Sequence, residues 1–184
     1  HQYIHKRDIL EKMEKVKNVF NYSNALHFAE LANLAYQEEK QFKKTASAMG
    51  YKSVKYFNVD GAQAYGMAKE DYIVLAFRGT EPTQFNDIKA DLNALHVRNE
   101  LGAGRVHKGF KREVDDIWEQ IEDWLAKRKF TQAYTCGQSL CGAMSTIACS
   151  RLPEGTICYN YGSPRVGTPS WVREFDNKFT LYRF

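Results

Sequence analysis

The 184-residue sequence has only four cysteines and no CxxC pair, which excludes the usual zinc and thiol redox motifs. We expect Cys136, Cys141, Cys149 and Cys158 to be small buried thiols.

No signal peptide is visible, although the chain begins at His1 and a leader could have been removed. The long uncharged stretch 131–150 contains Gly, Ser and Gln, so it does not fit a membrane span. The sequence is compatible with either a cytoplasmic or a secreted protein.

The charge is also nearly balanced, since 26 Lys and Arg against 22 Asp and Glu leave a net charge of +4. Basic and acidic side chains alternate at helical spacing, as in Asp8 and Lys12, and form no basic patch. We therefore expect no nucleic-acid partner, and likewise no metal and no cofactor. Hydrophobic residues make up 43% of the chain, and no repeat or low-complexity linker divides it, which predicts one globular domain over residues 1–184.

Hydrophobic periodicity predicts an α/β domain whose sheet is mostly parallel, with an antiparallel N-terminal portion and helices on both faces. The Asp60-Gly61 pair predicts a hairpin between the first two strands. Helices are expected at 7–20, 25–36, 110–128, 140–151 and 169–177, and strands at 53–60, 62–68, 72–78, 133–137, 156–161 and 179–184.

The segment around Ser139 has the layout of a nucleophile elbow, in which a strand passes through a sharp turn into a helix. Such a turn forces the serine into a strained backbone conformation and exposes its hydroxyl at the carboxyl edge of the sheet. Gly137 is required there because a side chain would collide with the turn. The amide of Leu140, at the helix N-terminus, becomes a candidate oxyanion donor. The alternative is an ordinary small-residue turn with a serine cap.

Three further motifs surround this turn: Phe77-Arg78-Gly79-Thr80, Arg105-Val106-His107-Lys108-Gly109-Phe110 and Tyr161-Gly162-Ser163-Pro164-Arg165-Val166-Gly167. Together with the Ser139 segment, they make residues 25–184 resemble the class 3 (fungal lipase-like) family. The resemblance implies the three-layer α/β-hydrolase fold. It also implies that His107 is a structural histidine.

The same resemblance places functional roles on particular residues. It implies that Ser139 is the nucleophile, that Thr80 and Leu140 form the oxyanion hole, and that Asp91 supports the Thr80 hydroxyl. The stretch 81–92 corresponds to a mobile lid, whose apolar face would carry Phe85, Ile88 and Leu92. For these three residues the alternative is a helix packed permanently on the core.

The catalytic acid and base are missing from the sequence. A serine nucleophile needs a histidine base, which in turn needs an acid, and the family order is Ser, Asp, His. No histidine follows His107, and the only acids after Ser139 are Glu154, Glu174 and Asp176. The resemblance places the family acid just after a strand like Leu181–Phe184. We therefore expect the domain to be C-terminally incomplete, with Asp and His supplied beyond Phe184.

Two departures from the family pattern flank the nucleophile: Gln138 replaces its usual histidine, and Cys141 replaces its glycine. We expect the Cys141 side chain to crowd the elbow helix against neighbouring strands, and Gln138 to alter a structural contact. Both weigh against efficient turnover, although neither removes the nucleophile.

The sequence therefore predicts a serine ester hydrolase, a lipase or esterase of the acylglycerol type, acting through an acyl-enzyme on Ser139. Its partners would be a lipid or other ester substrate and, through the lid, a lipid interface. This chain alone would be inactive or weakly active. The alternative is an inactive pseudo-hydrolase that serves as a binding domain. A chain that ends on a strand also exposes an unpaired edge, which predicts self-association.

Overall fold

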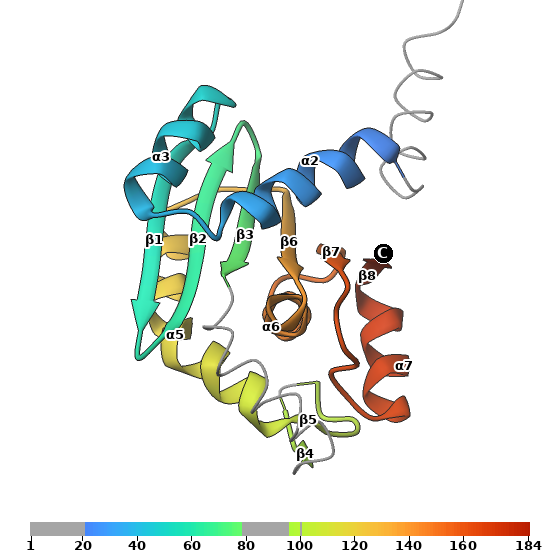
Figure 1. Cartoon of the computed structure of the whole chain (residues 1–184). Helices are drawn as coiled ribbons and strands as arrows, with labels where there is room; N and C mark the ends of the chain where they lie inside the picture. The colour runs from blue at the N-terminus through green and yellow to red at the C-terminus, as the bar shows by residue number, and fades with distance from the viewer. Residues whose placement is uncertain (1–20, 79–95, 100) are drawn as a thin grey trace, which may run out of the picture.

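The molecule is built around one six-stranded mixed sheet, seen in a computed structural model that describes residues 21–78, 96–99 and 101–184 (Figure 1). The strand order is β1-β2-β3-β6-β7-β8. The first three strands pair antiparallel, whereas β3, β6, β7 and β8 run parallel. The strands are β1 (Lys52–Val59), β2 (Ala62–Lys69), β3 (Tyr72–Arg78), β6 (Gln132–Gln138), β7 (Ile157–Tyr161) and β8 (Thr180–Arg183).

Tight turns connect the antiparallel strands. Asp60 and Gly61 both have positive φ, 51° and 88°, which is the pattern of the two-residue turn that matches strand twist. Val59 then pairs with Ala62 across the hairpin. The hairpin predicted from the Asp60-Gly61 pair is confirmed.

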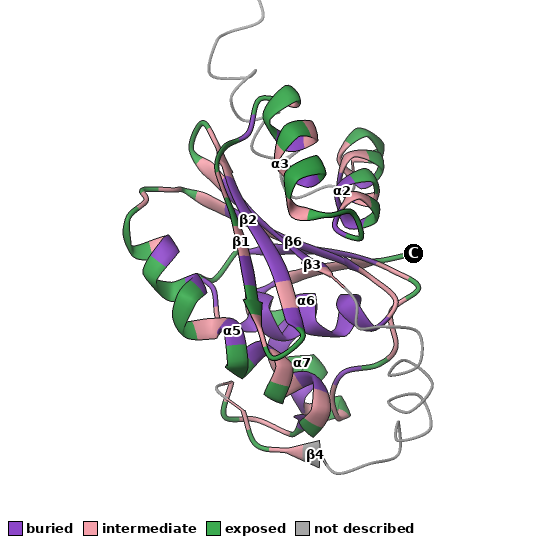
Figure 2. Cartoon of the chain, turned by 60° about the vertical axis from the view of Figure 1, so that its left-hand side comes forward, coloured by how far each residue is buried: buried purple, intermediate pink, exposed green. Residues whose placement is uncertain are grey.

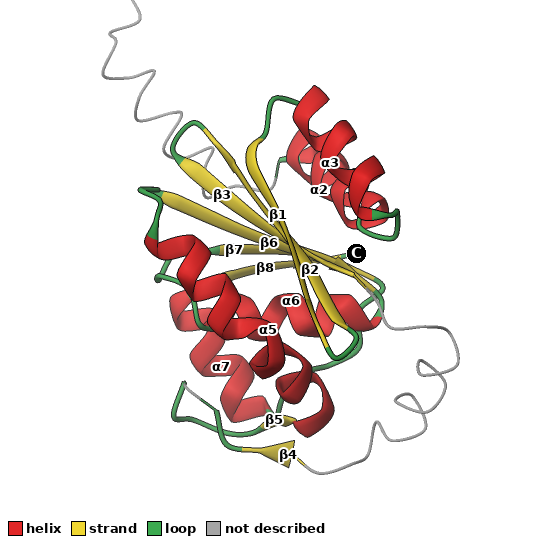
Figure 3. Cartoon of the chain, turned by 90° about the vertical axis from the view of Figure 1, so that its left-hand side faces the viewer, coloured by secondary structure: helices red, strands yellow, loops and turns green. Residues whose placement is uncertain are grey.

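In the described part of the chain, five helices cover the two faces of this sheet (Figure 3). Helices α2 (Tyr22–Leu34) and α3 (Glu39–Ala48) lie on one face, and α5 (Lys108–Ala126), α6 (Leu140–Ser150) and α7 (Pro169–Lys178) lie on the other. A separate two-stranded sheet pairs β4 (His96–Val97) with β5 (Val106–His107). Among the described residues, no helix is long and apolar enough to cross a bilayer.

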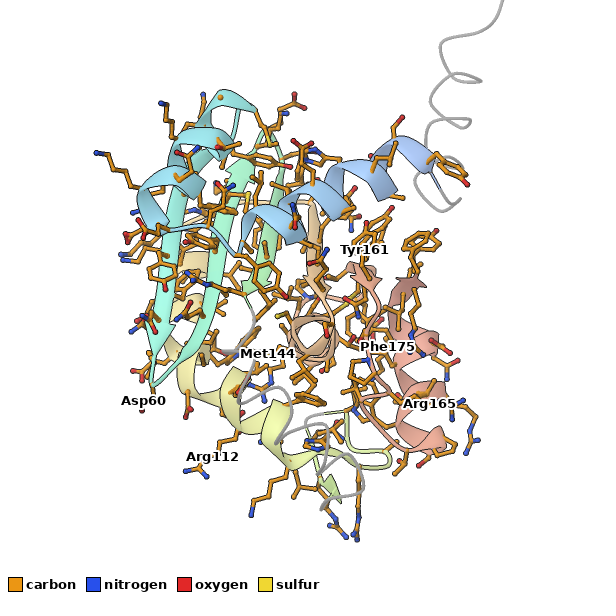
Figure 4. The ribbon with its side chains drawn as sticks, in the orientation of Figure 1. Asp60, Arg112, Met144, Tyr161, Arg165 and Phe175 are labelled. Atoms are coloured by element: carbon orange, nitrogen blue, oxygen red, sulfur yellow. The ribbon has the colours of Figure 1, made fainter. Side chains whose placement is uncertain are left out.

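Each face of the sheet has its own hydrophobic core because successive side chains of a strand point to opposite sides. Ile73 and Leu75 of β3 pack with α5 and α6, whereas Val74 packs with α2 and α3. In Figure 4, Tyr161 lies beside α2, while Met144 of α6 and Phe175 of α7 lie on the opposite side of the sheet. The predicted three-layer α/β arrangement is therefore observed.

Helix α6 is buried along its whole length (Figure 2). It follows β6 directly and packs against β6, β7, β3 and α5. Its sequence, Leu-Cys-Gly-Ala-Met-Ser-Thr-Ile-Ala-Cys-Ser, contains mainly small residues, which let a helix approach a sheet closely. This burial fixes the N-terminus of α6 at the carboxyl ends of the parallel strands.

The sequence did not predict three elements, namely α3, β4 and β5. Helix α3 has few apolar residues and buries only Phe42 and Ala46, so little in its sequence marks it as part of the core. Its position depends on tertiary contact, since the ring of Phe42 stacks on Tyr65 of β2 with centroids 3.7 Å apart. Strands β4 and β5 are two residues each, too short to show alternation. The helix expected at 7–20 lies outside the described residues.

Candidate active site

Ser139 occupies the turn between β6 and α6 with backbone angles φ 54° and ψ −125°. A positive φ is unfavourable for a residue with a Cβ, so this conformation persists only where surrounding contacts enforce it. One such contact is the hydrogen bond from the Ser139 amide to the carbonyl oxygen of Tyr161, at 2.8 Å. The strained serine predicted from the sequence is thus observed.

Two glycines allow the turn to pack tightly. A Cβ at Gly137 would overlap the carbonyl group of Cys141 and lie 2.7 Å from the amide nitrogen of Gly142. A Cβ at Gly142 would lie 2.6 Å from the Cβ of Ser163, in the loop after β7. The predicted requirement for glycine at position 137 is therefore confirmed, and Gly142 adds a second close approach on the other side of the helix.

Buried polar side chains hold the first turns of α6 against the sheet. Asn160 of β7 is fully buried and donates to the carbonyl oxygen of Gly142 at 2.8 Å and to the Thr146 hydroxyl at 2.6 Å. The Thr146 hydroxyl also donates to the Gly142 carbonyl at 2.9 Å. Further along, the Ser145 and Thr135 hydroxyls are 3.0 Å apart. These bonds satisfy polar groups that burial would otherwise destabilise.

Cys141 belongs to the same hydrophobic core as Leu75 and Phe77 of β3, and it also contacts the segment between α2 and α3. Its Sγ lies 3.6 Å from the hydroxyl of Tyr36, and its side chain is buried. The crowding against neighbouring strands that we expect from Cys141 stays a prediction, because this contact does not test it. Burial is the main cause that raises the pKa of the Cys141 thiol to about 12, and burial also raises the pKa of Tyr36. Both groups are neutral at physiological pH.

The other three cysteines are buried as well, and none of the four forms a disulfide. This burial is as predicted.

His107, also expected to be structural, is the N-cap of α5: its Nδ1 accepts from the amides of Gly109 and Phe110 at 3.0 and 3.4 Å. That bonding satisfies two of the free amides at the helix start.

Glu113 of α5 is a feature that the sequence analysis missed. Burial raises the pKa of this carboxyl to about 7, with a smaller contribution from the like charge of Asp116. Its neighbours in sequence, Val114 and Ile117, are buried on the apolar face of α5. The sequence could have indicated this raised pKa, because Glu113 lies at the border of the apolar face of α5.

The structure places only part of the expected site. Ser139 and Leu140 adjoin each other at the start of α6, and Gln138 ends β6 beside them. The other expected residues, Thr80, Asp91, Phe85, Ile88 and Leu92, lie outside the described residues.

The three acids that follow Ser139 in the sequence lie away from the carboxyl edge of the sheet. Glu154 is exposed before the start of β7, at the amino edge. Glu174 pairs with Lys178 at 3.2 Å in the last turns of α7, and Asp176 lies in the same helix, just before β8 begins. These positions agree with the expectation that none of the three is the triad acid.

A groove of about 570 Å³ lies next to the elbow, between α7, β8 and the loop after β7. Asn160, Thr146 and Ser163 line its inner wall, and Arg165 and Arg183 lie among its outer residues. Ser139 is not a lining residue, so the groove adjoins the nucleophile turn without containing it.

The parallel sheet, the buried helix after β6 and the strained serine between them define an α/β-hydrolase fold. The family model for class 3 lipases matches residues 74–184, and the chain belongs to that family.

Solved fungal lipases share the fold. A lipase from Rhizopus microsporus var. chinensis matches with a TM-score of 0.65 and 20% identity, covering 89% of this chain and 66% of that one. A variant of MDLA from Penicillium cyclopium matches with a TM-score of 0.66 and 21% identity, covering 90% of this chain and 72% of that one.

A sequence relative is Toxin TseL of Vibrio cholerae serotype O1, which is 27% identical over 186 aligned residues. The alignment covers 76% of this chain and 28% of TseL. The chain therefore spans little more than a quarter of this relative, and just under two thirds of the Rhizopus lipase.

Proposed function

We propose that the chain is the nucleophile-bearing part of a serine ester hydrolase, a lipase or esterase that acts on acylglycerols or similar esters. The observation that carries the proposal is Ser139 itself, a non-glycine residue with φ 54° between β6 and the N-terminus of α6. The energetic cost of this conformation is explained if the turn serves to present the hydroxyl.

In the proposed reaction the Ser139 hydroxyl attacks the ester carbonyl while a histidine accepts its proton. The Leu140 amide, at the N-terminus of α6, and Thr80 donate to the oxyanion, and Asp91 supports the Thr80 hydroxyl. The intermediate then expels the alcohol, which takes the proton from the histidine, and leaves the acyl group on Ser139. Water hydrolyses this acyl-enzyme to the free acid and restores the serine.

The histidine and its acid would come from residues beyond Phe184. The end of β8 supports this placement because the Gly162 amide donates to the Phe184 carbonyl at 2.7 Å, one residue after Tyr161. Tyr161 in turn accepts from the Ser139 amide. Residues that follow Phe184 would thus start two strands away from the nucleophile, at the same edge of the sheet.

The lid is a further part of the proposal. Phe85, Ile88 and Leu92 would form its apolar face and would contact a lipid interface when the site opens. In this role they would couple ester hydrolysis to the presence of aggregated substrate.

The similarity to a protein named a toxin supports a narrower proposal about the biological effect of the proposed hydrolysis. We infer that ester hydrolysis by Ser139 damages the cell that is exposed to it. Production of the whole protein in a bacterial host should then slow growth, and Ser139→Ala should restore it. Equal growth inhibition by both forms would contradict this proposal.

Fluorophosphonate labelling tests the hydrolase proposal directly, because the probe reacts with activated serines. In the whole protein that carries this sequence, we expect one adduct at Ser139 and ester turnover that disappears in Ser139→Ala. Absence of both the adduct and the turnover would contradict it and favour the inactive binding domain. Turnover that survives the substitution would contradict the role of Ser139 as the nucleophile.

A further inference from the structure

The segment that joins α2 to α3 contacts three elements at the carboxyl edge of the sheet. The Tyr36 hydroxyl lies 3.6 Å from the Sγ of Cys141 in α6. The carbonyl oxygen of Gln37 accepts from the Tyr65 hydroxyl of β2 at 3.2 Å and from the Arg78 guanidinium of β3 at 3.5 Å. This segment therefore links the last residue of β3 to the first turn of α6.

The first turn of α6 is held from two other directions. On the strand side, the carbonyl group of Cys141 packs against Gly137, where no Cβ would fit. On the β7 side, Asn160 holds the carbonyl of Gly142. Tyr36 supplies the contact to the Cys141 side chain, two residues after Ser139.

The Tyr36 hydroxyl and the Cys141 thiol are suited to form a stable hydrogen bond. Both the phenol and the thiol stay protonated at neutral pH, so either one can donate the hydrogen bond. The backbone next to Tyr36 is held in place, because the carbonyl of Gln37 accepts hydrogen bonds from two side chains. Glycine at position 141, the residue of the family pattern, would have no side chain for Tyr36 to hold.

We propose that Tyr36 is a positioning residue for the nucleophile turn. Its hydroxyl holds Cys141 and thereby keeps the first turn of α6, with the Leu140 amide, in the place that Ser139 requires. The Cys141 side chain thereby gives the first turn of α6 a contact that the glycine of the family pattern could not make. The consequence for catalysis rests on the proposed serine hydrolase function, whereas the effect on the helix turn does not.

Amide hydrogen exchange tests the positioning without any catalysis. In the whole protein, Tyr36→Phe removes only the hydroxyl, and we expect exchange in the peptide spanning residues 138–144 to accelerate about threefold or more, the factor of a weak hydrogen bond. Tyr22→Phe is the matched control, since Tyr22 is 76% exposed at the start of α2, outside the segment that contains Tyr36, and it should leave this peptide unchanged.

Fluorophosphonate labelling tests the catalytic consequence. We expect Tyr36→Phe to lower the limiting labelling rate of Ser139 about threefold to fivefold while the half-saturating probe concentration stays the same. In the Cys141→Gly background, Tyr36→Phe should have no further effect, because the partner of the hydroxyl is gone.

The outcomes separate the two proposals. If wild-type Ser139 is not labelled at all, the proposed function fails, and hydrogen exchange alone decides on Tyr36. Unchanged exchange in Tyr36→Phe would overturn the inference in either case. Equal effects of Tyr36→Phe with Cys141 and with glycine at position 141 would also overturn it, because the hydroxyl would then act through some other group.

Discussion

The Ser139 amide donates a hydrogen bond to the Tyr161 carbonyl at 2.8 Å, so the candidate nucleophile is tied to the end of the neighbouring strand β7. The Tyr161 hydroxyl reaches in the opposite direction and donates to the carbonyl of Ala25 in α2. One residue thus connects the nucleophile turn with the helix layer on the other face of the sheet. The position of Ser139 depends on both layers of the fold.

Ser139→Gly is expected to stabilise the protein and abolish its labelling. Glycine adopts φ 54° without the strain that a Cβ causes, so the free energy of unfolding should rise by about 1 kcal/mol relative to Ser139→Ala. Ser139→Ala is the matched control, since it lacks the hydroxyl but keeps the Cβ. Thermal unfolding of the two variants measures the difference, and equal stability would show that the turn is not strained.

Gly137→Ala is expected to destabilise the protein by about 2–4 kcal/mol, because its Cβ would overlap the backbone of Cys141. Gly61→Asn is the control: Gly61 has φ 88° and open space around it, and Asn tolerates this conformation. Chemical denaturation should show a large loss for the first variant and a small one for the second. A mild effect of Gly137→Ala would mean that the turn can relax.

Asn160→Ala is expected to lower the free energy of unfolding by about 2–3 kcal/mol, because it leaves a cavity and removes three buried hydrogen bonds, two donated by the amide and one accepted from the Cys158 thiol. It should also slow the labelling of Ser139, since the first turn of α6 loses a support. Asn58→Ala, at an exposed position of β1, is the control in the same denaturation experiment. Equal stability of the two variants would contradict the role of Asn160.

Glu113→Gln is expected to stabilise the protein above neutral pH. The folded-state pKa of about 7 exceeds the ordinary value of 4.5, so the folded state binds more protons between these values. Stability from this group is therefore full below pH 4.5, falls as pH rises to 7, and stays low above it.

The substitution removes this dependence and should add about 1–2 kcal/mol at pH 8. Melting temperatures from pH 4 to pH 8 measure the effect, with the exposed Glu119→Gln of the same helix as control. A parallel pH profile of wild type and Glu113→Gln would contradict the burial of this carboxyl.

The edge strand β8 leads to a prediction about assembly. It pairs with β7 alone within the six-stranded sheet, so the other side of the strand can accept a further strand. We expect the 184-residue chain, produced by itself, to associate as its concentration rises. Sedimentation velocity between micromolar and hundred-micromolar concentrations measures this, and a monomer throughout would contradict it.

Local sequence patterns predicted most of the elements. The amphipathic stripe of α5, the alternation of strands and helices, and the Asp60-Gly61 hairpin depend on residues near one another in sequence. They were therefore readable before the fold was known. The strands β4 and β5 are too short to show a period, and helix α3 has too few apolar residues to stand out.

The sequence by itself determined the nucleophile turn, because Gly137 and Ser139 satisfy steric requirements that act within a few residues of the chain. It also showed that residues 108–184 contain no histidine. Only the tertiary structure decided what surrounds that turn. The contact between Tyr36 and Cys141 joins residues 105 positions apart, and the raised pKa of Glu113 comes from burial. Both depend on how layers pack together, and no local pattern encodes that packing.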